Sequence, residues 1–334
     1  MTTESTLSAS SGSAELIEGF QVDCRIRGMA PGSIPRYLSV IKIFCGYLNA
    51  HEICLIDVDR DVLRGFLEYL RLERGVSHKT LENYFTVLSS LYEYLAYEGF
   101  VEKNPVLPVR KRYLKRYKEN DEGQMRKLIS VEEMAALINS TMDPRDKAII
   151  TLLAKTGIRR NELVSLDVED IDWVDQKIRL KPAHKRTNRI IFFDDETAVV
   201  LHRWLRARKA RKGCDSPALF ISDWGTRINR NGVYQVVTEA AKRVGLHNPS
   251  SDQMEDHFSP HCCRHWFTTH LRRAGMSREF IQELRGDVRR EAIDIYDHID
   301  KKELRESYLA HIPQLGILFD EDLLRRSDWR PESK

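Results

Sequence analysis

From Ala14 to Phe100 the apolar residues recur at intervals of three or four positions, and no stretch alternates as a strand would. This spacing places apolar side chains along one face of a helix, so the segment predicts amphipathic helices. Gly28, Gly75 and Gly99 follow three of the apolar stretches, as glycine does at helix ends. The sequence therefore predicts a compact domain of four helices over residues 14–105.

The residues ahead of this domain carry no sign of a membrane or export segment. Residues 1–13 are rich in serine and threonine and lack the basic region and apolar core of a signal peptide. No apolar run in the chain is long enough to span a bilayer. We expect a disordered leader on a cytoplasmic protein that has no membrane partner.

A basic stretch, residues 106–127, follows the helical domain. A chain of 334 residues is long enough for about two domains, so this stretch is expected to be a partly extended linker between them. Such a charge run is commonly a solvated linker, but a cationic strap can also follow a phosphate backbone. The linker and the helical domain supply these expected DNA-binding residues: Arg36, Lys79, Arg110, Lys111, Arg112, Lys115 and Arg116.

The second expected domain, residues 128–303, mixes helices with a few strands. Ser130 and Glu133 have the spacing of a capping box, and Asp143-Pro144 is a helix start whose helix ends at Gly157. Alternation predicts a hairpin with strands at 177–181 and 189–193, a short strand at 219–221, and helices at 196–211 and 231–244. The fold class is therefore mainly α with a small β-sheet.

Ser259-Pro260 predicts the start of a later helix, because serine can cap free N–H groups and proline fits the first turn. His261 and Arg264 are three residues apart and so share a face of that helix. A guanidinium binds phosphate oxygens in a bidentate manner, and an imidazole can donate to a third oxygen. Taken alone, a His and an Arg at this spacing are more often a solvated face with a partly packed ring.

Other polar residues fit the same chemistry. Arg159 is expected at a helix start, three residues before a Glu162 that could orient it. Lys181 ends the first strand of the hairpin, whose Lys185 and Arg186 are further candidate DNA-binding cations. A short helix at 291–299 is expected to carry Tyr296.

This order of residues resembles the tyrosine recombinase (phage integrase) family. The resemblance is carried by the motifs Thr156–Leu163, Pro260–Leu271 and Leu284–Asp287, together with Lys181 and Tyr296. It covers nearly the whole chain and implies a SAM-like core-binding domain followed by a mixed α/β catalytic domain. It also implies a site-specific recombinase that acts as a tetramer on two double-stranded DNA sites, with the tail of residues 304–334 docking on a neighbouring protomer.

The resemblance assigns roles that physical chemistry explains. Tyr296 resembles the nucleophile that forms a 3′-phosphotyrosine bond, and a phenol of pKa near ~10 needs nearby positive charge to attack at neutral pH. Arg159 and Arg264 would hold the non-bridging oxygens of the phosphate. Lys181 would protonate the leaving 5′-oxygen, while His261 would donate to phosphate or manage the tyrosine proton. The reaction implied needs no metal and no cofactor.

One position departs from the family pattern. Asp287 stands where the family usually has His or Trp, in a form similar to that of some archaeal integrases. A carboxylate there would repel phosphate unless it were paired, so Asp287 is expected to orient an arginine or Lys181, or to accept the proton of Tyr296.

Three alternatives remain open at this point. The chain could be a catalytically degenerate recombinase fold that only binds DNA, which the change at Asp287 favours. It could be a metalloenzyme that uses the histidines His257, His261, His265 and His270. The glutamate of an HExxH pattern is missing, however. Tyr308 is a conceivable nucleophile, but we interpret it as an apolar contact of the tail.

The six cysteines show no CxxC pairing and are expected to be reduced thiols.

Overall fold

The computed structural model describes residues 3–114, 128–182, 188–287 and 299–317, and side chains from residue 12 onward. By contacts the chain divides into two compact units, residues 1–122 and 123–334. The described part is mostly helical, with one three-stranded antiparallel sheet, which confirms the predicted fold class. No helix in the described ranges is long and apolar enough to cross a membrane.

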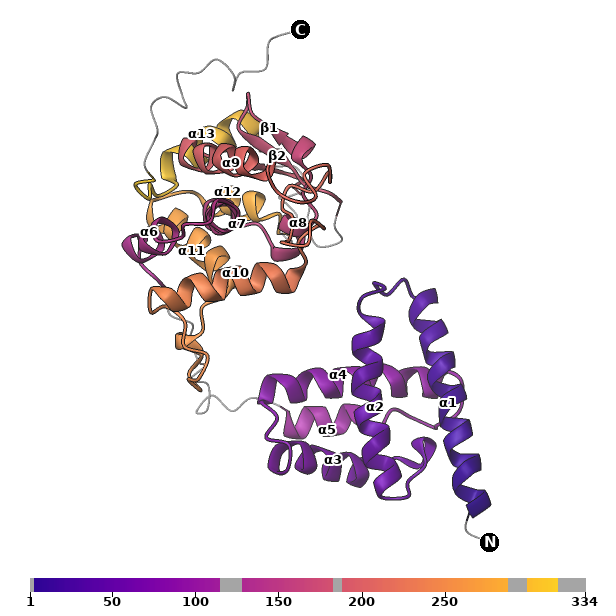
Figure 1. Cartoon of the computed structure of the whole chain (residues 1–334). Coiled ribbons are helices and arrows are strands. Elements are labelled where there is room, and N and C mark those ends of the chain that lie inside the picture. Colours follow the sequence, from indigo (N-terminus) through magenta and orange to yellow (C-terminus); the bar gives the residue numbers. More distant parts are fainter. Residues whose placement is uncertain (1–2, 115–127, 183–187, 288–298, 318–334) are drawn as a thin grey trace. The chain divides into compact units, whose positions relative to one another are not determined.

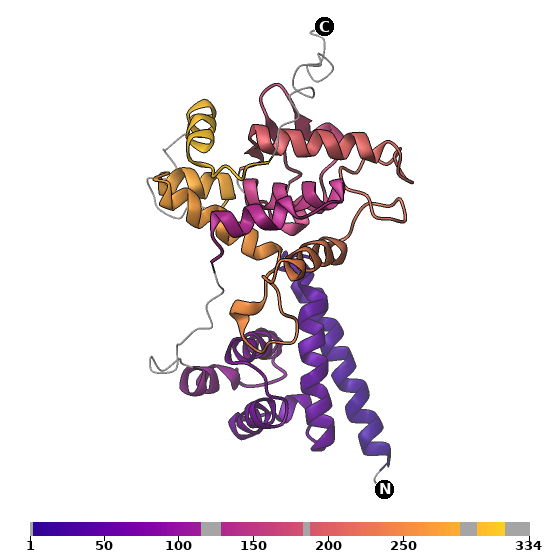
Figure 2. The ribbon, with the colours of Figure 1, turned by 60° about the vertical axis from the view of Figure 1, so that its left-hand side comes forward.

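The first unit is a bundle of helices around one apolar core (Figure 1). Its elements are α1 (Thr3–Ile26), α2 (Ile34–Ala50), the 3-10 turn η1 (Leu55–Asp57), α3 (Arg60–Leu72), α4 (His78–Tyr97) and α5 (Val106–Tyr113). Helix α4 contacts α1, α2 and α5, and it buries an apolar stripe that includes Phe85 and Tyr92. Helices α1 and α2 run alongside each other in both views (Figures 1 and 2). Phe44 packs edge-on against Phe66 at the centre of the core.

Two local expectations for this unit need correction. The helix α1 begins at Thr3, whereas we expected a disordered leader through residue 13; no proline or glycine interrupts residues 3–11, so nothing in the sequence stops a helix there. The expected linker begins with the helix α5, because Val106 and Val109 lie one turn apart and are both buried.

The second unit is arranged around helix α7. Its elements are α6 (Val131–Asn139), α7 (Pro144–Thr156), α8 (Arg160–Val164), the 3-10 turn η3 (Val168–Asp170), β1 (Ile171–Asp172), β2 (Lys177–Arg179), β3 (Ile190–Phe192), α9 (Asp195–Arg208), α10 (Arg230–Arg243), η4 (Met254–Asp256), α11 (Pro260–Arg273), α12 (Arg278–Arg285) and α13 (Lys301–His311). Helix α7 contacts α6, α9, α10 and α11, and Figure 1 shows it nearly end-on between them. Most of its side chains are therefore buried, polar ones included.

Local capping explains where these elements begin. Ser130 and Glu133 form the predicted capping box of α6, with hydrogen bonds of 3.1 and 2.7 Å. The Asp143 side chain accepts from the first free N–H groups of α7. The predicted hairpin is present as β2 and β3, and β1 adds a third strand in the order β1-β2-β3. The strand expected at residues 219–221 is wrong, because Ile221 forms only an isolated bridge to Arg227, and the neighbouring Ala218 another to Asp167.

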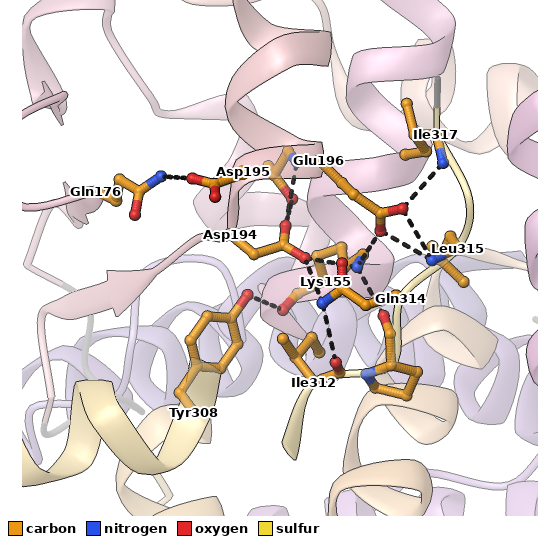
Figure 3. Close-up of polar contacts among 12 residues, drawn as sticks. Lys155, Gln176, Asp194, Asp195, Glu196, Tyr308, Ile312, Gln314, Leu315 and Ile317 are labelled. Atoms are coloured by element: carbon orange, nitrogen blue, oxygen red, sulfur yellow. Dashed lines mark hydrogen bonds and ion pairs between the residues drawn. The ribbon is translucent and has the colours of Figure 1, made fainter. Parts of the chain in front are cut away.

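The carboxy-terminal segment, residues 301–317, packs inside its own unit (Figure 3). Leu304 and Tyr308 of α13 are buried in a cluster with Phe267 and Leu271 of α11. Its last residues reach α9, where the Glu196 carboxylate accepts from the backbone N–H groups of Leu315 and Ile317 at 2.8–3.0 Å. The predicted docking on a neighbouring protomer is thus not the arrangement seen for residues 301–317, since their apolar side chains are buried in hydrophobic clusters of the same chain.

Candidate active site

The end of helix α7 places the first candidate arginine. Gly157 follows α7 with φ 60°, and this left-handed turn lets the chain reverse before α8. Arg159 is the N-cap residue of α8, where Glu162 accepts from its backbone N–H at 2.8 Å and from its guanidinium Nη1 at 3.1 Å. The expectation that Glu162 orients Arg159 is confirmed. The Arg159 side chain remains about one third exposed, so its guanidinium can meet a ligand.

Helix α11 supplies the second arginine. It begins at Pro260 as predicted, although the Ser259 hydroxyl lies 3.6 Å from Cys262 Sγ and makes no capping hydrogen bond. The Arg264 side chain is only 6% exposed, and its Nη1 donates to the Gly157 carbonyl oxygen at 2.7 Å. The turn that positions Arg159 therefore also fixes Arg264.

Asp287 brings the two arginines together. Its Oδ1 accepts from Arg159 Nη2 at 2.9 Å and from Arg264 Nη2 at 3.0 Å. Arg285 Nε lies 3.0 Å from Oδ2, and the Arg285 carbonyl oxygen accepts from Arg264 Nη2 at 3.1 Å. Of the partners expected for Asp287, the structure thus shows both arginines. Lys181, the other cation considered for Asp287, pairs elsewhere.

Lys181 follows strand β2 and points to two carboxylates. Its Nζ lies 3.0 Å from Asp167 Oδ2 and 3.0 Å from Asp170 Oδ1. The Lys181 side chain is 40% exposed, and the hydrogen bonds that its ammonium donates to Asp167 and then to Asp170 raise its pKa. Arg227 also contacts Asp167, at 2.5 Å. Sequence reasoning missed Asp167 and Asp170, because an acidic residue after a helix gives no signal that it will face a lysine from a hairpin.

The histidines are dispersed over separate partners. His261 is exposed at the start of α11, and its ring packs edge-on against that of His265 at 4.6 Å between centroids. His257 and His270 contact the backbone carbonyl oxygens of Ser251 and Ile129. Among the residues that the structure describes, no three His, Cys, Asp or Glu side chains gather as a metal site requires.

Several predicted residues lie outside the described ranges. These are Tyr296, the hairpin cations Lys185 and Arg186, and the linker cations Lys115 and Arg116. Tyr308 is described: it is 1% exposed, and its hydroxyl donates to the Lys155 carbonyl oxygen at 3.0 Å. The interpretation of Tyr308 as a packing residue is confirmed.

In the first unit, three of the predicted DNA-binding cations share one surface. Lys79 of α4 and Arg110 and Lys111 of α5 line a hollow of about 670 Å³. Lys79 pairs with Glu82 at 3.0 Å, and Arg110 donates to the Thr86 hydroxyl at 3.1 Å. Two further cations lie elsewhere on the unit, namely Arg36, exposed on α2, and Arg112, whose guanidinium lies 5.8 Å from the ring centroid of Tyr113.

Replacing Gly157 with alanine should disrupt the arginine site through the fold. A Cβ at this position would overlap the buried ring of Phe267, and the positive φ is itself strained for alanine. We expect a loss of about 2–4 kcal/mol in the free energy of unfolding. Urea unfolding measures it, and Gly245→Ala, at φ 76° with open space around it, is the control for backbone strain alone. A loss at Gly157 no larger than at Gly245 would contradict the predicted overlap.

The chain matches known proteins over both units. Residues 121–303 match the model of the phage integrase family, and residues 16–100 match that of the phage integrase N-terminal SAM-like domain. The tyrosine recombinase XerC of Thermodesulfovibrio yellowstonii is 30% identical over 75% of this chain and 81% of its own length. XerC of Herpetosiphon aurantiacus is 31% identical over 82% of this chain and 86% of its own length.

Solved structures agree on the fold. The Tn1549 transposon integrase in complex with transposon right end DNA superposes with a TM-score of 0.62 at 19% identity, covering 87% of this chain and 97% of that one. A lambda integrase dimer bound to a COC′ core site superposes with a TM-score of 0.62 at 16% identity, covering 86% of this chain and 98% of that one.

Proposed function

Since this chain belongs to the phage integrase family and is a tyrosine-type site-specific recombinase, we propose that it cleaves and religates DNA through a 3′-phosphotyrosine intermediate formed by Tyr296. The observation that carries the proposal is the convergence of Arg159 and Arg264. Their guanidinium groups, from α8 and α11, lie 2.9 and 3.0 Å from one anionic oxygen, Oδ1 of Asp287. A pair of this kind can hold the two non-bridging oxygens of a phosphodiester.

The proposed step balances without a cofactor. The Tyr296 oxygen attacks the scissile phosphorus while the bond from phosphorus to the 5′-oxygen breaks. The phenol proton passes to a base, for which we propose His261, and Lys181 gives a proton to the leaving 5′-oxygen. Arg159 and Arg264 offset the charge that develops on the phosphoryl oxygens. The ester formed keeps the bond energy, so religation is the same step in reverse.

We propose double-stranded DNA as the partner of both units. The solved relatives named above are bound to DNA. Lys79, Arg110 and Lys111 form a cationic hollow suited to phosphate contacts, although Lys79 must exchange its contact with Glu82. Assembly as a tetramer on two sites is also part of the proposal. Truncation after Ile299 would not test it cleanly, because it removes Leu304 and Tyr308 from the core.

Trapping and mapping a covalent complex tests the function. The protein is incubated with fragmented duplex DNA that contains nicks, and DNA that stays attached to protein under denaturing conditions is sequenced. We expect attachment at a 3′ end, a free 5′-hydroxyl on the released strand, and the same yield in excess EDTA. DNA that is bound but never attached would favour the degenerate DNA-binding protein, for which the carboxylate between the arginines is the supporting observation.

Lys181 should matter for the leaving group alone. Lys181→Ala is expected to slow cleavage of an ordinary strand by about 10²–10⁴-fold, the usual contribution of a general acid. A strand with sulfur in place of the 5′-bridging oxygen has a leaving group that needs no proton, so the variant should cleave it nearly as fast as the wild type does. Single-turnover cleavage rates measure both.

A matched control lies four residues earlier, on the strand that Lys181 follows. Lys177 of β2 also pairs with two aspartates, Asp172 and Asp175, and Lys177→Ala should leave both rates unchanged. If sulfur does not restore Lys181→Ala, the lysine is not the proton donor.

A further inference from the structure

Asp287 occupies the position between Arg159 and Arg264 that an anionic ligand of both would take. Its Oδ1 lies 2.9 Å from Arg159 Nη2 and 3.0 Å from Arg264 Nη2. A carboxylate and a phosphodiester each carry one negative charge and accept from guanidinium groups in the same manner. With Arg264 almost fully buried, its charge needs a nearby anion whether or not DNA is present.

The hydrogen-bond donors of Arg264 make this a competition. Its Nη2 carries two hydrogens, one directed to the Arg285 carbonyl oxygen at 3.1 Å and the other to Asp287 at 3.0 Å. Its Nη1 donates to the Gly157 carbonyl oxygen. A phosphate oxygen can therefore bond to Nη2 only where Asp287 or the carbonyl oxygen now does, and the side chain is the more easily moved of the two.

The local backbone allows that movement. Helix α12 ends in a Schellman motif, with Gly286 at φ 62°. The Gly286 N–H donates to the Glu283 carbonyl oxygen, and the Asp287 N–H donates to the Gln282 carbonyl oxygen at 3.1 Å. The Asp287 main chain is thus held in place, and rotation of its side chain alone can release the arginines. The side chain is 29% exposed, so the released carboxylate can reach water.

Building on the function proposed above, we infer that Asp287 is a stand-in for the scissile phosphate. In the free protein it holds Arg159 and Arg264 in register and balances their charge, and the phosphate displaces it when DNA binds. The same contacts would also suit a carboxylate that stays in place and only orients the arginines. The two roles predict opposite effects of removing the carboxylate on anion affinity. Removing a competitor strengthens anion binding, whereas removing an orienting group weakens it.

Inorganic phosphate is the probe that separates these roles without DNA. Calorimetric titration is carried out on the full chain and on Asp287→Asn, which keeps the size of the side chain and removes its charge. We expect Asp287→Asn to bind phosphate about tenfold more tightly than the wild type, within the usual range of coupling between two ligands of one site. Equal or weaker binding would overturn the inference.

The matched control is another aspartate that bridges two arginines. Asp223 Oδ1 lies 2.7 Å from Arg145 Nη1 and 3.6 Å from Arg211 Nη1, in the same unit. Asp223→Asn changes the net charge equally, and its phosphate affinity should match that of the wild type. If Asp223→Asn gained as much phosphate affinity as Asp287→Asn, the gain would come from the change in net charge alone. That result would also overturn the inference. Thermal unfolding is recorded first, and Asp287→Ser replaces Asp287→Asn if the latter does not fold.

Cleavage of the mapped DNA site separates this inference from the proposed function. If Asp287 leaves before the reaction, Asp287→Asn should still form the covalent adduct and reach half-maximal rate at about tenfold less DNA. A variant that needs more DNA than the wild type would count against displacement. Should the wild type form no adduct on any DNA while the phosphate result holds, the proposed function fails and the stand-in role survives.

Discussion

Replacing Tyr296 with phenylalanine should abolish the covalent protein–DNA adduct and every recombinant product. Phenylalanine has no oxygen with which to form the ester, so no residual rate is expected from this route. Affinity for the DNA site should change by less than about threefold, because the phosphate contacts come from lysine and arginine side chains. Denaturing gels measure the adduct, and gel shifts measure the affinity of the same preparations.

Tyr308 provides the matched control. Its hydroxyl is buried and donates to the Lys155 carbonyl oxygen, and burial raises the pKa of this phenol well above its usual value. Tyr308→Phe loses one hydrogen bond, about 0.5–1.5 kcal/mol of stability, and should form the adduct at the wild-type level. An adduct that persists in Tyr296→Phe would mean that another residue is the nucleophile.

The features that the sequence predicted correctly are those decided within a few residues. Ser130 and Glu133 satisfy each other across one turn, and Gly157 ends α7 because a left-handed residue is needed there. Glu162 meets Arg159 because three residues of helix bring them together. Local geometry fixes such contacts whatever the rest of the chain does.

Contacts between distant segments could not be predicted in this way. Asp287 meets Arg159 across 128 residues of sequence, and only packing of α12 near α8 and α11 decides that both arginines share one oxygen. Resemblance to a family placed the arginines in one site but left the role of Asp287 undefined, because the family usually has His or Trp there. Helix α5 was missed for another reason: its two buried valines, Val106 and Val109, are too few to outweigh the cations around them.

The buried ion cluster beside the carboxy-terminal segment also joins residues that are far apart in the sequence, and it should contribute strongly to stability. Lys155 of α7 is fully buried, and its Nζ lies 2.6 Å from Asp194 Oδ2, from Glu196 Oε2 and from the Pro313 carbonyl oxygen (Figure 3). Lys155→Met would leave two buried carboxylates without their cation. We expect the free energy of unfolding to fall by about 3–5 kcal/mol. Urea unfolding at neutral pH measures the loss.

Two comparisons separate charge from packing in this result. Lys147→Met, two turns earlier on α7 and only partly buried, should change stability by less than about 0.5 kcal/mol. Adding Asp194→Asn and Glu196→Gln to Lys155→Met removes the uncompensated charge, so it should recover much of the loss, although Glu196 also binds the N–H groups of Leu315 and Ile317. If the triple variant is no more stable than Lys155→Met, the loss comes from packing of the lysine stem, and the ion cluster does not hold the carboxy-terminal segment in place.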